Sequence, residues 1–243
     1  MPEFTQTHMY MGAREGIGPG VVIYGAPLDV TTSFRPGTRF GPRALRDHSW
    51  GLETYDLQTG RDLEHLVYYD AGDVDLVPGA LEESLDAIRS ATSSVLGAGG
   101  KPLVLGGEHL CSLPVIEAIY PHHPGLAIIH LDAHADMRLD YLGRQYTHAG
   151  VMRRAAMAVG RENVYQLGIR SASSDEVDYA RTPAGNFHPF DLAAMASVAA
   201  RLSNRPVYLS VDIDVVDPAF APGTGTPEPG GVSAIDLLRS LEH

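Results

Sequence analysis

Short apolar runs alternate along this chain with segments whose apolar residues recur at every third or fourth position. The runs predict strands over residues 21–25, 66–70, 102–105, 126–131, 164–169 and 206–211, with a shorter one near 187–190. The three-and-four spacing predicts helices over residues 80–96, 43–50, 113–120, 151–159, 191–202 and 233–241, the last with Ser233 as its N-cap. Strands that alternate with helices form a parallel sheet covered by helices, so the pattern predicts an α/β fold. No repeat or linker interrupts it, which indicates one domain over residues 1–243.

Composition and charge narrow the class of protein. Apolar residues make up 44% of the 243 residues, which is enough to bury a core. No apolar run approaches the roughly 20 residues that span a bilayer. A single cysteine, Cys111, fits a reducing cytoplasm, where we expect the protein to be located. Thirty acidic against 18 basic residues give a formal charge of −12, which argues against nucleic acid or an anionic membrane as partner.

Carboxylates and imidazoles follow the ends of three predicted strands. Asp132, His134 and Asp136 alternate after residues 126–131, Asp212 and Asp214 alternate after residues 206–211, and His109 follows residues 102–105. Ligands bind beyond the carboxyl ends of the strands in open α/β sheets, so we expect these side chains to meet. Four carboxylates cannot share a buried site without a large repulsion and desolvation penalty, which divalent cations remove.

The donor types indicate which metal and how many ions. The set is rich in oxygen and lacks thiolates, which favours Mn²⁺, Mg²⁺ or a similar ion over structural zinc. Six side chains are many for one ion and natural for two ions bridged by carboxylates, a site that generates hydroxide near neutral pH. Taken singly, an aspartate at a strand end is more often a helix cap and a histidine more often a solvated residue, so the hypothesis depends on the combination.

Several longer motifs stand out along the chain. They are G-G-E-H at 106–109, D-A-H-A-D at 132–136 and S-V-D-I-D-V-V-D-P-A-F-A-P-G-T-G-T-P-E-P-G-G at 210–231, with G-A-P-L-D at 25–29, F-R-P-G-T-R-F-G-P-R-A-L-R at 34–46 and D-A-G-D-V at 70–74. Together these motifs resemble those of the ureohydrolases, the arginase and agmatinase family. The resemblance implies a three-layer α/β/α fold with a mostly parallel, eight-stranded sheet, and a homotrimer or homohexamer. It also implies two Mn²⁺ ions whose bridging hydroxide attacks a guanidinium carbon and releases urea and an amine. The positions that match the family's metal ligands are His109, Asp132, His134, Asp136, Asp212 and Asp214.

The resemblance also implies catalytic residues. His148 occupies the position of the family's active-site histidine and would protonate the leaving amine, because imidazole titrates near neutrality. Asp136 is expected to serve catalysis as well as metal binding. Asp217 matches no ligand, and we expect it to support the site or shape the turn before Pro218. Glu108 replaces the family's usual aspartate before the metal histidine and could orient the His109 ring.

The substrate is predicted from the residues after D-A-H-A-D. Met137 and Arg138 with the D-Y-L-G-R-Q-Y-T-H-A-G run are similar to agmatinases, so a small guanidino compound, agmatine, is the first expectation. An inward-pointing Arg138 would suit guanidinobutyrate better, whereas an exposed Arg138 would pair with Asp140; arginine is a further alternative substrate. Two other hypotheses are a mononuclear zinc amide hydrolase similar to deacetylases, and a non-catalytic metal-binding homologue.

The resemblance predicts one element beyond the printed sequence. Family members continue past the last helix with a strand whose end carries a glutamate that binds the guanidinium group, and the sequence stops at His243 before it. We therefore expect a portion of a longer protein, a truncated chain, or a short homologue whose gap a partner closes. In each case the sheet should show an unpaired edge.

Overall fold

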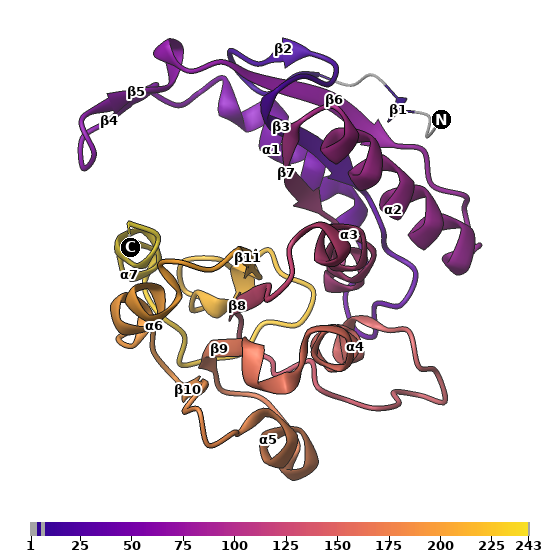
Figure 1. Cartoon of the computed structure of the whole chain (residues 1–243), viewed down its shortest axis with the longest axis vertical. Helices are drawn as coiled ribbons and strands as arrows, with labels where there is room; N and C mark the ends of the chain where they lie inside the picture. The colour runs from indigo at the N-terminus through magenta and orange to yellow at the C-terminus, as the bar shows by residue number, and fades with distance from the viewer. Residues whose placement is uncertain (1–3, 6–7, 243) are drawn as a thin grey trace. The chain divides into compact units, whose positions relative to one another are not determined.

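Parallel strands form the centre of each of the two units into which the chain divides (Figure 1). The computed structural model describes residues 4–5 and 8–242. The first unit runs to Val30 and resumes over Pro36–Ile119, and the second consists of Thr31–Arg35 and the chain from Tyr120 onward. The single domain expected for residues 1–243 stays a prediction.

The sheet of the first unit has the strand order β1-β6-β3-β7, with β2 also pairing with β6. Its strands are β1 (Phe4–Thr5), β2 (Arg14–Glu15), β3 (Gly20–Ala26), β6 (Tyr68–Val74) and β7 (Gly100–Gly106), and all pairings are parallel except that of β1. Val22 and Tyr24 pack on one face against Ala91 and Val95 of α2 (Leu81–Gly97). Gly25 lies on the opposite face, where an added Cβ would meet Pro42 of α1 (Gly41–Ser49). The two helices therefore cover opposite faces of the sheet.

The remaining elements of the first unit are short. They are η1 (Thr38–Phe40), the two-stranded ribbon of β4 (Tyr55–Asp56) and β5 (Arg61–Asp62), η2 (Leu63–His65), η3 (His109–Cys111) and α3 (Ser112–Ile119).

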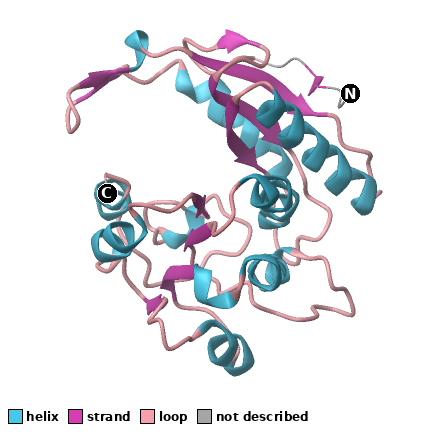
Figure 2. Cartoon of the chain, viewed as in Figure 1, coloured by secondary structure: helices cyan, strands magenta, loops and turns pink. Residues whose placement is uncertain are grey.

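The sheet of the second unit has the order β10-β9-β8-β11 and is parallel throughout. Its strands are β8 (Ala127–Leu131), β9 (Val164–Ile169), β10 (Phe187–Pro189) and β11 (Val207–Val211). Its α-helices are α4 (Val151–Val159), α5 (Ser174–Ala180), α6 (Met195–Leu202) and α7 (Ala234–Ser240). Its short 3-10 helices are η4 (Tyr120–His122), η5 (His148–Gly150), η6 (Arg161–Asn163) and η7 (Ile213–Val215). Ile129, Leu131 and Leu167 form a core with Met195 of α6 and Leu237 of α7. Helix α4 lies on the opposite side of the strands (Figure 2). The unit is thus a sheet between two helical layers.

All seven predicted strands are present, but some boundaries were wrong. Strand β6 begins at Tyr68 instead of residue 66 and continues to Val74, because the polar D-A-G-D-V segment extends the pairing while its aspartates bind a buried arginine. Helix α6 begins at Met195 instead of residue 191, because Asp191 accepts a hydrogen bond from the Ala193 N–H and forms a turn.

One α-helix of the described residues was missed, and its N-terminal signal is readable in the sequence. Helix α5 carries a capping box in which Ser173 and Glu176 satisfy each other's backbone N–H groups. The same device confirms the predicted N-cap of α7, where Ser233 pairs with Asp236.

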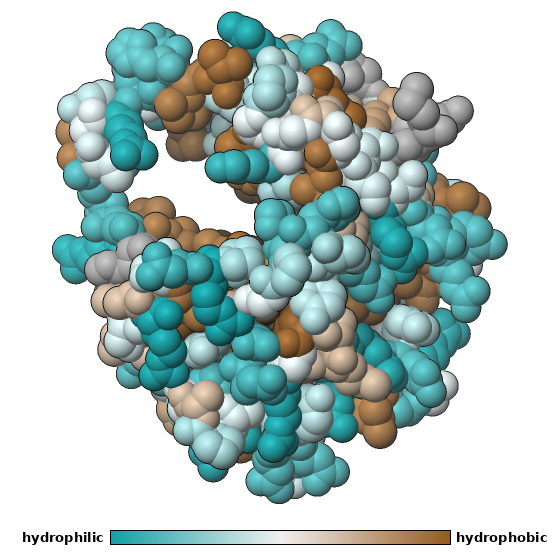
Figure 3. All heavy atoms as spheres, viewed as in Figure 1, coloured by the Kyte–Doolittle hydropathy of each residue, from teal (hydrophilic) through white to brown (hydrophobic). Residues whose placement is uncertain are grey.

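Strand β11 forms an edge of its sheet. Among the strands that the structure describes it pairs only with β8, and one of its faces exposes Val207, Leu209 and Val211 at 40%, 44% and 41%. Elsewhere the visible surface is mainly hydrophilic with smaller apolar patches (Figure 3), in keeping with the acidic composition. No helix within the described part of the chain is long and apolar enough to cross a membrane.

Candidate metal centre

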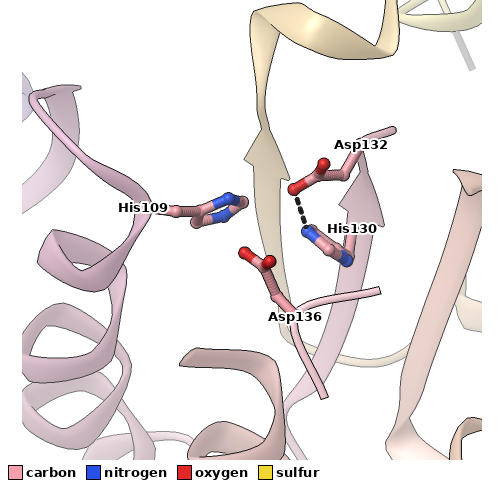
Figure 4. Close-up of side chains that lie close together, drawn as sticks. All are labelled: His109, His130, Asp132 and Asp136. Atoms are coloured by element: carbon pink, nitrogen blue, oxygen red, sulfur yellow. Dashed lines mark hydrogen bonds and ion pairs between the residues drawn. The ribbon is translucent and has the colours of Figure 1, made fainter. Parts of the chain in front are cut away.

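The end of β8 places a fully buried carboxylate in a hydrogen-bonded frame. Asp132 is 1% exposed, and its Oδ1 accepts from the His134 N–H at 2.6 Å. The amide nitrogen of Gln166 lies 2.9 Å from His130 Nδ1, which makes Nδ1 the acceptor and leaves Nε2–H to donate to Asp132 Oδ2 at 2.7 Å. Figure 4 shows this bond between His130 and Asp132. The His130 ring therefore fixes the orientation of the Asp132 carboxylate.

Two carboxylates flank the His134 ring. Nδ1 of His134 lies 3.1 Å from Asp214 Oδ2 and 3.5 Å from Asp132 Oδ1. Burial alone would lower the pKa of His134, but hydrogen bonds to Asp132 and Asp214 outweigh it and raise the pKa to about 11. Burial, reinforced by the charges of Asp212 and Asp132, raises the pKa of Asp214 to about 8. These shifts report a crowded negative charge that a positive group must balance.

The segment after β11 brings the second pair of aspartates to the same edge of the sheet. The Asp212 side chain accepts from the Asp214 N–H at 3.1 Å, which closes the short helix η7. The Asp214 Oδ1 accepts from the Ala133 N–H at 3.1 Å and so links the ends of β11 and β8. Asp214 is buried and Asp212 is half-buried. The neighbouring parallel strands β8 and β11 therefore bring together acids that are about 80 residues apart in sequence.

Asp136 adopts a backbone conformation that is unusual for a residue other than glycine. Its φ of 52° lies in the left-handed region, and its side chain is buried. The Asp136 carbonyl accepts from the N–H groups of Met152 and Arg153 at the start of α4, at 3.0 and 3.1 Å. This capping of α4 stabilises the strained backbone and directs the carboxylate toward Asp132 (Figure 4).

The described aspartates and histidines of the second unit form two adjoining donor groups. One ligand atom from each of Asp132, His134 and Asp214 lies within 4.8 Å of the others, and the same holds for His130, Asp132 and Asp136. Asp132 belongs to both groups. Clustered carboxylate and imidazole donors fit Mn²⁺ or another divalent ion, and a shared carboxylate suits a pair of ions.

His109 belongs to the first unit, where it begins η3 after the turn that follows β7. The preceding turn is tight, because an added Cβ at Gly107 would lie 2.0 Å from the Leu28 carbonyl oxygen. Glu108 is buried, and its Oε1 accepts from the Val30 N–H at 3.0 Å. The Glu108 side chain thus braces the loop that follows β3.

Sequence reasoning missed Glu228, which lies in the P-E-P-G-G turn. Its Oε1 is 3.7 Å from His134 Nε2 and accepts from the Ser171 hydroxyl at 3.0 Å. Asp217 Oδ2 holds this turn by accepting from the N–H groups of Gly230 and Gly231 at 2.7 and 3.0 Å. Backbone hydrogen bonds, from Ala219 first and then from Gly231 and Gly230, lower the pKa of the Asp217 carboxyl. Asp217 Oδ1 also accepts from the Ala219 N–H at 2.9 Å, which confirms the role expected for Asp217 in the turn at Pro218. His130 was also missed, although it extends the alternation of Asp132 and His134 by one step.

Arg138 does not pair with Asp140, contrary to one of the two expectations. Its Nε lies 3.6 Å from Glu176 Oε2, and its guanidinium lies over the Tyr141 ring at 5.3 Å. Asp140 instead accepts from the Gly143 N–H at 3.0 Å. The positive charge of Arg138 is therefore already balanced within the protein.

Comparison with known proteins gives consistent matches. The model of the family described as "Arginase family" matches residues 19–243. An agmatinase of Bacillus anthracis is 48% identical over 222 residues, which cover 91% of this chain and 77% of that protein. Among solved structures, proclavaminate amidino hydrolase from Streptomyces clavuligerus has a TM-score of 0.89 at 35% identity, covering 99% of this chain and 85% of the other. Agmatine ureohydrolase of Thermoplasma volcanium has a TM-score of 0.83 at 31% identity, covering 98% and 82%. These matches confirm the predicted α/β fold, a mostly parallel sheet between helical layers.

Proposed function

Because this chain belongs to the arginase family, and is therefore a hydrolase that acts on guanidino carbon–nitrogen bonds, we propose that it hydrolyses agmatine to putrescine and urea. The observation that carries the proposal is the pair of donor groups that share Asp132. We assign two Mn²⁺ ions per chain to them, with Asp132, His134, Asp136, Asp212 and Asp214 as ligands and His109 as the sixth. His130 and Glu228 would steady Asp132 and His134 from outside.

Two bound divalent ions would supply hydroxide near neutral pH for attack on the guanidinium carbon. Hydrolysis adds the oxygen of water to this carbon and breaks its bond to the alkylamine nitrogen, so that urea and the amine are released. The departing nitrogen needs a proton, which we assign to the half-buried His148 ring as general acid. Asp136, whose carboxylate is buried beside Asp132, would also orient the reacting water.

The charge distribution favours agmatine over a guanidino acid. Agmatine is a dication at neutral pH, and a protein with a formal charge of −12 raises its local concentration. Guanidinobutyrate needs an unbalanced cation for its carboxylate, but Arg138 is paired with Glu176. Guanidinobutyrate and arginine are therefore the alternative substrates.

The test is urea and putrescine release by Mn²⁺-loaded protein offered agmatine, guanidinobutyrate or arginine. We expect the highest kcat/KM with agmatine and two manganese ions per chain by elemental analysis. Asp214→Asn should lose metal and lower kcat by at least 100-fold. The matched control, Asp178→Asn, changes an exposed carboxyl of α5 and should leave both values unchanged.

Other outcomes select the other hypotheses. One zinc ion per chain, with no urea formed, would favour a mononuclear amide hydrolase. Metal-dependent thermal stabilisation without turnover of any guanidino compound would favour a non-catalytic metal-binding protein.

We also propose a homotrimer or homohexamer, as the resemblance to the family implies, and a location in the cytoplasm, which the single cysteine, Cys111, fits. Sedimentation equilibrium measures the oligomeric state, and cell fractionation measures the location. A monomer, or recovery in the membrane fraction, would contradict these assignments.

A further inference from the structure

A hydroxyl from the loop after β3 contacts the His148 ring across 117 residues of sequence. Thr31 Oγ1 accepts from the His148 backbone N–H at 3.0 Å and lies 3.2 Å from the ring Nδ1. Both residues belong to the second unit. One hydroxyl therefore meets the main chain and the side chain of the same histidine, which restricts rotation about its χ1 and χ2 bonds.

Two more side chains surround the ring. Ser33 Oγ lies 3.3 Å from Nε2, and the Tyr141 ring packs edge-on with centroids 5.7 Å apart and an interplanar angle of 82°. Tyr141 is itself held, because its backbone exchanges hydrogen bonds of 3.0 and 3.1 Å with Arg144. The Thr31 contact is double and half-buried, whereas the Ser33 contact is single and exposed. Nε2 is thus the nitrogen whose protein contact solvent or substrate can replace.

We propose that Thr31 is a positioning residue that holds His148 in the orientation for proton transfer through Nε2. This inference rests on the proposed function only in giving His148 the role of proton donor. A misplacement of about 1 Å in a catalytic group lowers the rate by roughly 100-fold, so the contact has kinetic consequences.

The experiment compares Thr31→Val with Thr31→Ser and Thr32→Val. Valine removes the hydroxyl and keeps the shape, and serine keeps the hydroxyl. Thr32 is the matched control, since it is equally half-buried and makes no side-chain hydrogen bond to a residue that the structure describes. We expect Thr31→Val to lower kcat by about 10- to 100-fold, with KM within about 2-fold and metal content unchanged. Thr31→Ser should recover most of the rate, and Thr32→Val should behave as wild type.

A second measurement tests whether the effect passes through His148. In a His148→Ala background, Thr31→Val should lower kcat no further, because the group that it positions is gone. Equal losses in both backgrounds, or a wild-type kcat for Thr31→Val, would overturn the proposal.

A readout without turnover separates this inference from the proposed function. In Mg²⁺-loaded protein with ¹⁵N-labelled histidine, His148→Ala identifies the His148 ring signals. Thr31→Val should shift these signals, and Thr32→Val should not. If wild type released no urea from any guanidino compound, the proposed function would fail while these signals still report the contact. Unchanged signals in Thr31→Val would overturn the positioning role whatever the activity.

Discussion

Replacing Arg46 with methionine removes the charged partner of the buried Asp70 and the half-buried Asp73 in the first unit. Arg46 is fully buried, and its Nε and Nη2 donate to Asp70 at 2.8 and 2.9 Å. Its Nη1 donates to Asp73, and Nη2 also donates to the Gly72 carbonyl at 3.0 Å. Burial would lower the pKa of Arg46, but its hydrogen bonds to the two aspartates outweigh this and raise it, so the guanidinium stays charged.

The expected loss of unfolding free energy depends on the groups that remain buried after Arg46 is replaced by methionine. Methionine fills the space of the arginine stem, so the main change is at the fully buried Asp70 carboxylate. Among the residues that the structure describes, only the N–H groups of Tyr10 and Gly72 would still donate to it. Breaking a buried ion pair from one side costs about 3–5 kcal/mol of unfolding free energy. At about 2–4 °C per kcal/mol for a chain of this size, Tm should fall by roughly 6–20 °C.

Urea unfolding followed by Trp50 fluorescence measures this loss, because the single tryptophan lies at the end of α1, four residues after Arg46. The matched control is Arg89→Met on α2, whose side chain is 39% exposed and pairs with Glu117. An exposed pair contributes only about 0–1 kcal/mol. A loss below about 1 kcal/mol for Arg46→Met, or equal losses at both positions, would refute the argument that burial makes the difference.

Two further predictions concern the metal and the turn before η3. Chelation of the Mn²⁺-loaded protein should lower its Tm, because Asp132 and Asp214 then repel each other. At a free metal concentration of 100 Kd the stabilisation lost is about 2.7 kcal/mol for each ion removed. Calorimetry showing an unchanged Tm would count against a metal at these residues. Gly107→Ala should lower the unfolding free energy by about 1–3 kcal/mol, because the added Cβ would collide with the Leu28 carbonyl. The control is Gly97→Ala at the end of α2, where the added Cβ meets nothing within 4 Å. In the same urea assay this control should be neutral or slightly stabilising.

Local signals explain which parts of the fold could be predicted. The spacing of Leu85, Ile88 and Val95 predicts α2 because their burial follows helical periodicity directly. Strand β6 was placed too early because its second half is polar, and Asp70 and Asp73 are stabilised by Arg46, which lies in a different element. Polar strand residues of this kind carry no local signal of burial.

Some residues of the candidate site could likewise be predicted from the sequence, and others could not. The alternation of Asp132, His134 and Asp136 was sufficient to suggest metal chemistry, because donor type and spacing are properties of the sequence. Glu228 could not be found, because its approach to His134 depends on a turn that Asp217 holds closed.

The sequence by itself determined the chemical classes of the donors, the strand ends from which they project and the family to which the chain belongs. Only the tertiary structure decided that His130 fixes Asp132, that Glu176 balances Arg138 and that Thr31 holds His148. The physical reason is the separation along the chain between the residues that interact. Periodicity and capping act within a few residues, whereas these contacts depend on sheet pairing and loop packing between distant segments.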